Sequence, residues 1–190
     1  VDPEMLQRAQ EIIEERRRKY DPERMLEELE NMRLRCGIIH ASLLRINDEI
    51  PTSRTFSHRF GSMDGAIQEL YSSQREKAKQ DVHERIRQCV PGVLPYSDFL
   101  VLDQKLTLSV QPAVPVQRGY SSYWPFRADP RGVIDITLGV FLSEPDHPKI
   151  MGYVVLPRLL TNGKTLRFHS SSSRTELFCQ SDLGFLQQLL

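Results

Sequence analysis

The hydrophobic pattern of this chain changes once, at residues 90–93, which are Val-Pro-Gly-Val. Before this point, apolar residues recur every three or four positions, as they do on one face of a helix. After it, they gather in short runs rich in Val, Leu, Phe and Tyr, which is typical of strands. Because Pro and Gly interrupt regular structure, the change predicts two modules. We expect an α+β fold, with a helical module over residues 1–90 and an α/β module with a mainly antiparallel sheet over residues 93–190.

Start and stop signals divide the first module into several helices. Asp2-Pro3 and Asp21-Pro22 each combine an N-cap residue with a proline at the first helical position. Gly37 and Gly61 are typical of helix C-terminal caps. The helices predicted in this way begin at residues 3 and 22 and continue with 41–46, 53–60, about 63–71 and 72–88.

Alternating and apolar runs predict the strands of the second module. Residues 98–103 and 106–113 should form a hairpin, and residues 133–143 should pair with 150–160 across a polar loop. Pro125 lacks the N–H group of an interior strand, so residues 123–128 should form an edge strand. Two shorter strands at residues 165–170 and 175–180 and a final helix at 182–190 complete the prediction.

Charge and cysteine content restrict the classes of function. The 25 Lys and Arg residues equal the 25 Asp and Glu residues, which argues against a strongly basic nucleic-acid binder but permits a local basic face. Cys36, Cys89 and Cys179 are odd in number and far apart, so neither a disulfide framework nor a zinc site is expected. We expect three mostly buried thiols in a reducing cytoplasm.

Targeting signals are not visible in the sequence. It has no run of about 18 apolar residues that could cross a membrane, and its N-terminus is acidic and amphipathic rather than basic and then apolar. These features predict a cytoplasmic protein without a membrane partner.

Residues 41–60 have the outline of a helix-turn-helix unit, with helix 41–46, a turn at 47–51 and helix 53–60. Phe56 and Phe60 lie four positions apart and should face inward together. The alternative is the corner of a helical bundle with a solvated outer face. If the unit binds DNA, hydroxyl and basic side chains would face bases or phosphates. The predicted base contacts are Arg54, Ser57 and His58, and the predicted phosphate contacts are Arg59 and Ser62. Ser53 is predicted to point outward with them and to belong to the same DNA-binding set.

A second basic feature is the run Arg-Arg-Arg-Lys at residues 16–19. It could contact phosphate as a basic arm, or it could be a solvated helix end that pairs with Glu11, Glu14 and Glu15. Cations at the end of a helix also suit its dipole. The solvated helix end is therefore the favoured interpretation.

Asp135, followed by Glu144, raises the alternative of a metal-dependent nuclease. Such an enzyme needs acidic residues and a lysine on the next strand to hold the metal and activate water. The next predicted strand contains Gly-Tyr-Val-Val-Leu-Pro-Arg at residues 152–158 and supplies neither. The five histidines are scattered, and no catalytic triad or phosphate-binding glycine loop is visible. We expect no enzymatic activity, no metal site and no cofactor.

Three segments, residues 1–16, 50–71 and 129–158, carry a resemblance to a known family. The matching residues are Leu6, Ala9, Gln10, Ile12, Ile13 and Arg16 in the first segment, and Pro51, Ser53, Phe56, Arg59, Phe60, Gly61, Ser62, Ala66 and Tyr71 in the second. With these residues the chain resembles the large bacterial serine recombinases of the resolvase/invertase family. The first segment is similar to the end of the family's recombinase region, the second to the motif that follows it, and the third to a C-terminal piece of some members. A unit similar to the second segment also occurs in repeats beside homing endonucleases.

The resemblance implies a DNA-binding C-terminal fragment that places a site-specific recombinase on double-stranded DNA. The family's catalytic serine domain and its zinc ribbon have no counterpart here, so the resemblance assigns no catalytic residue to this chain. The alternative is a module that binds recombinase subunits, including other copies of the chain. In that case the exposed aromatic residues would be Tyr120, Tyr123 and Trp124.

Overall fold

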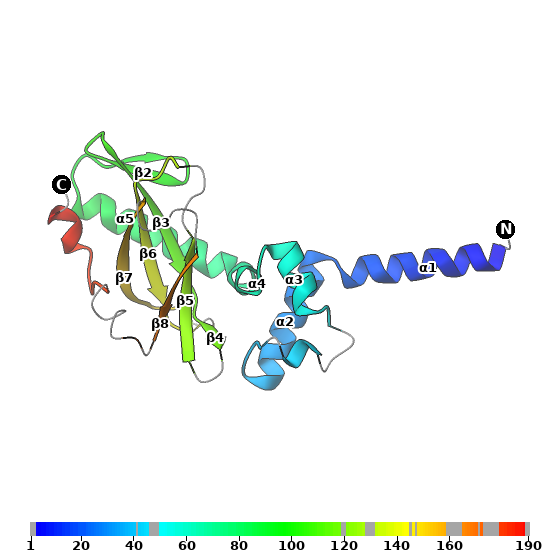
Figure 1. The fold of residues 1–190 in the computed structure, drawn as a ribbon. Helices are drawn as coiled ribbons and strands as arrows, with labels where there is room; N and C mark the ends of the chain where they lie inside the picture. Colours follow the sequence, from blue (N-terminus) through cyan, green and yellow to red (C-terminus); the bar gives the residue numbers. More distant parts are fainter. Residues whose placement is uncertain are drawn as a thin grey trace. The chain divides into compact units, whose positions relative to one another are not determined.

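The computed structural model divides the chain into two compact units (Figure 1). We call residues 1–70 the N-terminal unit and residues 71–190 the C-terminal unit, and we describe each by itself. The residues that the structure describes are 3–40, 42–45, 50–118, 121–127, 132–144, 146, 148–158, 165–170, 172 and 179–188. Within these ranges, side chains are described for all residues except 16–19, 118, 187 and 188.

Helices alone form the described part of the N-terminal unit. The structure confirms several predicted boundaries: Gly37 ends the second helix in the left-handed region with φ 75°, and its N–H donates to the carbonyl of Arg33. Met25, Leu29 and Phe56 are almost fully buried. The elements are α1 Pro3–Lys19, α2 Pro22–Cys36, the 3₁₀ turn η1 Leu43–Arg45, α3 Ser53–Phe60 and α4 Met63–Leu70.

The C-terminal unit consists of one long helix and two sheets. The first sheet has the strand order β1-β2-β3-β6-β7, and the second has the order β4-β5-β8. All neighbouring strands are antiparallel except β3 and β6, which are parallel. The elements are α5 Ser72–Cys89, β1 Leu94–Tyr96, β2 Phe99–Leu102, β3 Leu106–Ala113, β4 Val116–Arg118, β5 Ser121–Arg127, β6 Ile136–Leu142, β7 Ile150–Pro157, β8 Thr165–His169 and the 3₁₀ turn η2 Gly184–Gln188.

The first sheet lies between α5 and the second sheet, as Figure 1 shows. Arg75 of α5 donates from Nε to the carbonyl of Pro112 in β3 at 2.8 Å. On the other face, the rings of Phe126, Phe141 and Phe168 meet edge to face, with centroids 5.2–5.7 Å apart. The continuous burial of β6 follows from this position between two layers.

Several predicted boundaries were wrong. The units divide between Leu70 and Tyr71, so α5 belongs with the sheets rather than with the helical unit. Its buried residues Val82 and Ile86 explain why, since this polar helix needs a surface on which to bury its apolar stripe. The predicted helix at residues 41–46 is only a 3₁₀ turn within its described part.

Strand β5 is central in its sheet rather than at an edge, since it pairs with both β4 and β8. Pro125 lies opposite Arg167 in that ladder. The end of the chain also differs from the prediction, because residues 184–188 form a 3₁₀ turn and not an α-helix. Of the predicted strand 175–180, residues 175–178 lie outside the described residues, and Gln180 forms an isolated bridge with Tyr153.

Candidate nucleic-acid interface

Helix α3 begins and ends where its sequence predicts. Thr52 is the N-cap, and its hydroxyl oxygen accepts the backbone N–H of Thr55 at 3.4 Å. Gly61 ends the helix with φ 77°, a conformation that glycine adopts without steric cost. The eight residues Ser-Arg-Thr-Phe-Ser-His-Arg-Phe therefore form a short, well-capped helix that contains no acidic residue.

Two aromatic rings determine which side of α3 faces the core. Phe56 is fully buried, and its ring stacks on that of Phe60 with centroids 6.2 Å apart. The two rings thus share one side of the helix, as predicted, although only Phe56 is fully buried and Phe60 is half-buried. Arg54, His58 and Arg59 are exposed. The structure therefore leaves the three basic side chains of α3 accessible to solvent.

The serines predicted to contact DNA are less accessible than the basic residues. Ser53 and Ser57 are half-buried. Ser62 is also half-buried, and its hydroxyl oxygen accepts the backbone N–H of Gly65 at 2.8 Å. Ser62 therefore acts as the N-cap of α4, and one lone pair of its hydroxyl oxygen is already engaged.

The two helices that meet at Gly61 differ in charge. Helix α4 carries Asp64 and Glu69 and no basic residue, whereas α3 carries only basic ones. DNA phosphates attract cations, so α3 is the helix of this pair whose charge would suit a contact with DNA. A tight turn at Gly61 follows α3, and no α-helix precedes α3 within residues 42–45 and 50–52. Of the predicted turn at residues 47–51, residues 47–49 lie outside the described residues.

The basic run at residues 16–19 lies in the last turn of α1. Its side chains lie outside the described residues. The basic arm and the solvated helix end therefore both stay predictions.

The carboxylate of Asp135 accepts hydrogen bonds from Thr107 within the C-terminal unit. Its Oδ2 accepts the backbone N–H of Thr107 at 2.9 Å and lies 2.8 Å from the Thr107 hydroxyl. These hydrogen bonds lower the pKa of Asp135, and the nearby Arg158 contributes in the same direction. Asp135 thus connects the residues just before β6 to β3 through hydrogen bonds. This structural role explains the position of the carboxylate without a catalytic role. Among the described residues, no group of three or more His, Cys, Asp and Glu side chains could hold a metal ion.

The aromatic residues predicted to be exposed are buried. Tyr123 is 4% exposed and Trp124 is 7% exposed. The indole N–H of Trp124 donates to the carbonyl of Leu142 at 2.8 Å, and its ring meets that of Phe141 edge to face. Trp124 and Phe126 lie two residues apart, on the same side of β5, and both pack into the core between the sheets. The prediction of an interface at these two residues was wrong, and Tyr120 lies outside the described residues.

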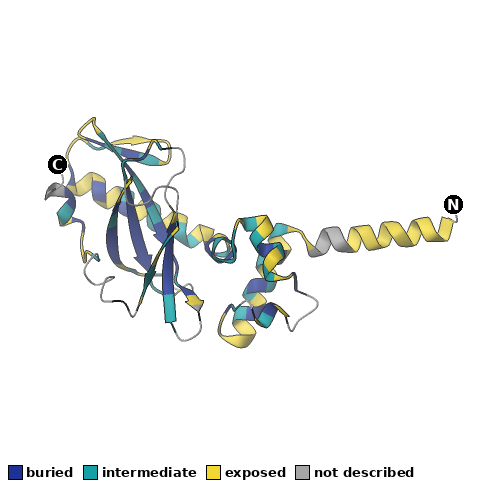
Figure 2. Ribbon diagram, viewed as in Figure 1, coloured by how far each residue is buried: buried dark blue, intermediate teal, exposed yellow. Residues whose placement is uncertain are grey.

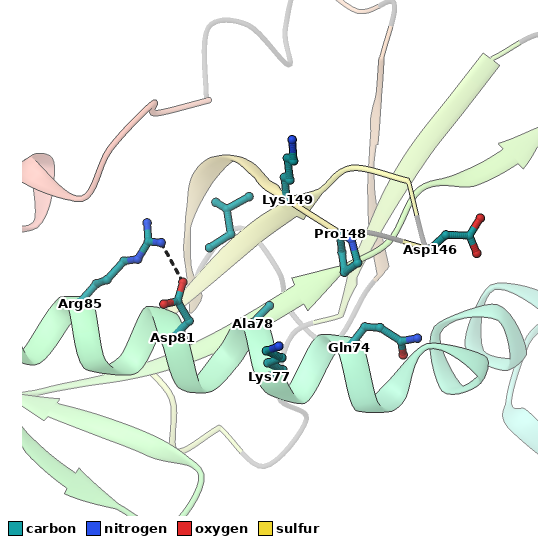
Figure 3. Close-up of a pocket in the computed structure, with 9 residues that line it drawn as sticks. Gln74, Lys77, Ala78, Asp81, Arg85, Asp146, Pro148 and Lys149 are labelled. Atoms are coloured by element: carbon teal, nitrogen blue, oxygen red, sulfur yellow. Dashed lines mark ion pairs between the residues drawn. The ribbon is translucent and has the colours of Figure 1, made fainter.

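A groove of about 780 Å³ lies in the C-terminal unit between α5 and the residues before β7 (Figure 3). Three of its charged residues, Lys77, Asp81 and Arg85, belong to α5, and Asp146 and Lys149 lie opposite. Arg85 and Asp81 form an ion pair at 3.0 Å, and Figure 3 shows Lys149 directed away from the helix. The opposite charges largely cancel, so the groove has neither the strong charge of an anion site nor an acid–base pair.

The cysteines differ in part from the prediction. Cys36 and Cys89 are exposed, and only Cys179 is half-buried. Burial raises the pKa of the Cys179 thiol, which favours the neutral thiol over the nucleophilic thiolate. All three are free thiols.

Comparison with known proteins does not assign a family or a function to this chain. No family model, curated protein or solved structure matches the chain. Within the described residues, every helix is too short or too polar to cross a lipid bilayer.

Proposed function

We propose that the N-terminal unit binds double-stranded DNA through the exposed face of α3. Arg54 and His58, one helical turn apart, would face base edges, and Arg59 would contact a phosphate. Ser53 and Ser57 would contribute hydroxyl groups at the edge of this face. Ser62 keeps its capping bond from Gly65 and would donate its hydroxyl hydrogen to a phosphate.

The observation that carries this proposal is a helix with one buried aromatic face and an exposed side that is only basic. Phe56 holds the helix in place, while Arg54, His58 and Arg59 remain exposed. A guanidinium group can donate two hydrogen bonds to guanine, and each such pair discriminates by about 1–3 kcal/mol against the wrong base. The resemblance to serine recombinases supports the same ligand. We propose that this contact helps to position a site-specific recombinase on its DNA.

The test is a titration of the whole chain with a pool of duplex DNA at low and high salt. Phosphate contacts release counterions, so affinity should fall with rising salt, with a slope of about 0.9 per phosphate contact. Arg59→Ala should weaken binding to all sequences and reduce that slope by about one. Arg54→Ala should weaken binding, and it should also reduce the preference of the chain for particular sequences within the pool.

Arg24 provides the matched control. It is an exposed arginine of α2 in the same unit, so Arg24→Ala removes one charge without touching α3. Its affinity for DNA should stay close to that of the unchanged chain. Binding that ignores salt, or an Arg24→Ala variant as weak as Arg54→Ala, would contradict the proposal.

A further inference from the structure

Thr55 lies on the side of α3 that faces away from the two aromatic rings. This helix has buried, half-buried and exposed residues around its axis, as Figure 2 shows. At about 100° per residue, His58 lies opposite the midpoint of Phe56 and Phe60. On the same count Thr55 lies about 60° from His58, closer than Arg59 at about 100°. Thr55 is therefore a half-buried residue near the centre of the outward side.

The hydroxyl group of Thr55 is held by the N-cap of the helix. Its Oγ1 lies 3.1 Å from Oγ1 of Thr52, and either hydroxyl can be the donor. The same Thr52 oxygen accepts the backbone N–H of Thr55 at 3.4 Å. The substituents on the β-carbon of threonine take staggered positions, so a fixed hydroxyl also fixes the γ-methyl group. Thr55 thus offers a ligand an ordered methyl group, while its hydroxyl is engaged within the helix.

The other side chains on the outward side of α3 end in charged or hydrogen-bonding groups. Arg54 and Arg59 are exposed cations, and His58 is an exposed imidazole. In the major groove such groups read the donors and acceptors of base edges, whereas the C5-methyl of thymine is read by apolar contact, for example with a threonine methyl. Thr55 is the third residue of α3, and the N-terminal residues of a recognition helix are those that contact bases.

We propose that the γ-methyl of Thr55 contacts the C5-methyl of a thymine in the DNA that α3 binds, a contact that rests on the proposed function of this helix. Thymine is preferred at that position, because no other base presents a methyl group in the major groove. Arg54 and Thr55 are neighbours in the chain, so this thymine lies close to the guanine that Arg54 contacts. Thr55 is therefore a specificity-determining residue, which adds an apolar contact to the polar contacts of Arg54 and His58.

Duplexes that differ by a single methyl group test the proposal. The whole chain first selects duplexes from a random pool, and each thymine of the best-bound sequence is then replaced in turn by deoxyuridine, which lacks only the C5-methyl. We expect one position at which this replacement weakens binding about fourfold, the effect of exposing one buried methyl group. Thr55→Ser removes the methyl group of the protein and should bind both duplexes with equal affinity. Such non-additivity between the two methyl deletions is the signature of a direct contact.

Two further variants are matched controls. Thr55→Val keeps a methyl group and removes only the hydroxyl, so it should retain the difference between the two duplexes. Thr52→Ser removes a methyl group from the cap residue and keeps the acceptor for the Thr55 N–H, so it should retain the difference as well. Circular dichroism should show all three variants to be folded, because each keeps a capping hydroxyl at residue 52.

The outcomes separate this contact from the DNA binding on which it rests. A chain that binds DNA in a salt-dependent manner but tolerates deoxyuridine at every position would overturn the thymine contact and leave the proposed function intact. A difference that Thr55→Ser retains, or that Thr55→Val abolishes, would also overturn it, because a different group would then meet the thymine methyl. A chain without salt-dependent DNA binding would overturn both.

Discussion

The ring of Phe126 in β5 packs directly on the backbone of Gly139 in β6. A β-carbon added to Gly139 would lie 2.9 Å from Cε1 of Phe126 and 2.7 Å from Cγ1 of Val154. Contacts below 3.0 Å do not occur for real β-carbons, so the absence of a side chain at residue 139 permits the two sheets to approach. Phe141, two residues further along the same face, then meets the Phe126 ring edge to face at 5.2 Å.

Gly139→Ala should destabilise the C-terminal unit by about 1–3 kcal/mol, as overpacking of a close-packed core does. The measurement is urea unfolding followed by fluorescence of Trp124, which lies in the same aromatic cluster. Adding Phe126→Leu to Gly139→Ala should cost less than the sum of the two single changes, because the smaller side chain makes room for the methyl group. Additive losses would show that the contact does not set the sheet spacing.

Asp135 should make the C-terminal unit sensitive to acid. Its pKa is lowered by the hydrogen bonds from Thr107, so its contribution to stability is fully present above the ordinary carboxyl pKa of about 3.9. The contribution is lost as the pH falls through the lowered pKa, because the folded state binds that proton less readily. Asp135→Ala should cost about 1–2 kcal/mol at pH 7, from the loss of hydrogen bonds to a charged acceptor.

The check is thermal unfolding at pH 7 and at pH 3. The difference in stability between Asp135→Ala and the unchanged chain should shrink at the lower pH. Asp103 offers a control, because it is an exposed aspartate of the same unit whose ion pair with Lys105 is also exposed. Asp103→Asn removes the charge but keeps a residue type that tolerates the left-handed φ of 47° at this position, so it should change stability by less than about 1 kcal/mol at either pH. An acid response that persists in full after Asp135→Ala would exclude Asp135 as its source.

His83 should give a second, separate pH dependence near neutrality. Its Nε2 is buried and has no hydrogen-bond partner in the described part of the chain. Burial lowers the pKa of His83; Lys79 and Arg87 act in the same direction and Glu76 acts against them. The unfolded state then binds the proton more readily, so stability is complete above pH 6.5 and declines as the pH falls through this value.

His83→Leu should remove this decline, because leucine has no charge to bury. Urea midpoints at pH 8 and pH 5.5 measure the effect. His58→Leu, which changes an exposed histidine of the other unit, should leave the midpoint difference of the C-terminal unit unaltered. If His83→Leu retained the full decline, another group would be responsible.

Two substitutions at Ser62 distinguish its role as the N-cap of α4 from its proposed contact with DNA. Ser62→Ala removes the acceptor of the Gly65 N–H and should cost the N-terminal unit about 1 kcal/mol. Ser62→Asp keeps an acceptor at the N-cap and should retain stability, while it adds a negative charge near α3. If Ser62 lies beside a phosphate, Ser62→Asp should weaken DNA binding at least several-fold in a titration at low salt, and equal affinity would place the phosphate elsewhere.

Much of the fold could be predicted because local signals and packing agree. Gly37 and Gly61 end helices as expected, and the stacked pair Phe56 and Phe60 follows from a spacing of four. The antiparallel pair β6 and β7 follows from two apolar runs around a polar loop. What could not be predicted was set by contacts between distant segments, such as the placement of α5 with the sheets and the central position of Pro125.

The candidate site could be predicted in part. The exposure of Arg54, His58 and Arg59 follows from helical periodicity once the aromatic face is known. Strand patterns cannot show whether a second sheet covers the other face. For this reason Trp124 was expected at the surface, although its N–H donates to Leu142 inside the core. Asp135 was named from its residue type, and its hydrogen bonds with Thr107 became visible only with the sheet in place.

The parallel neighbours β3 and β6 are consecutive members of one sheet, but β4 and β5 of the other sheet lie between them in the chain. A crossover of this kind usually contains a helix that can form early by itself. Here the connecting segment is a β-hairpin that lies against the sheet it links. We therefore expect the long loop to close and both layers to assemble in one slow, cooperative folding event, since the aromatic core contains side chains from both sheets.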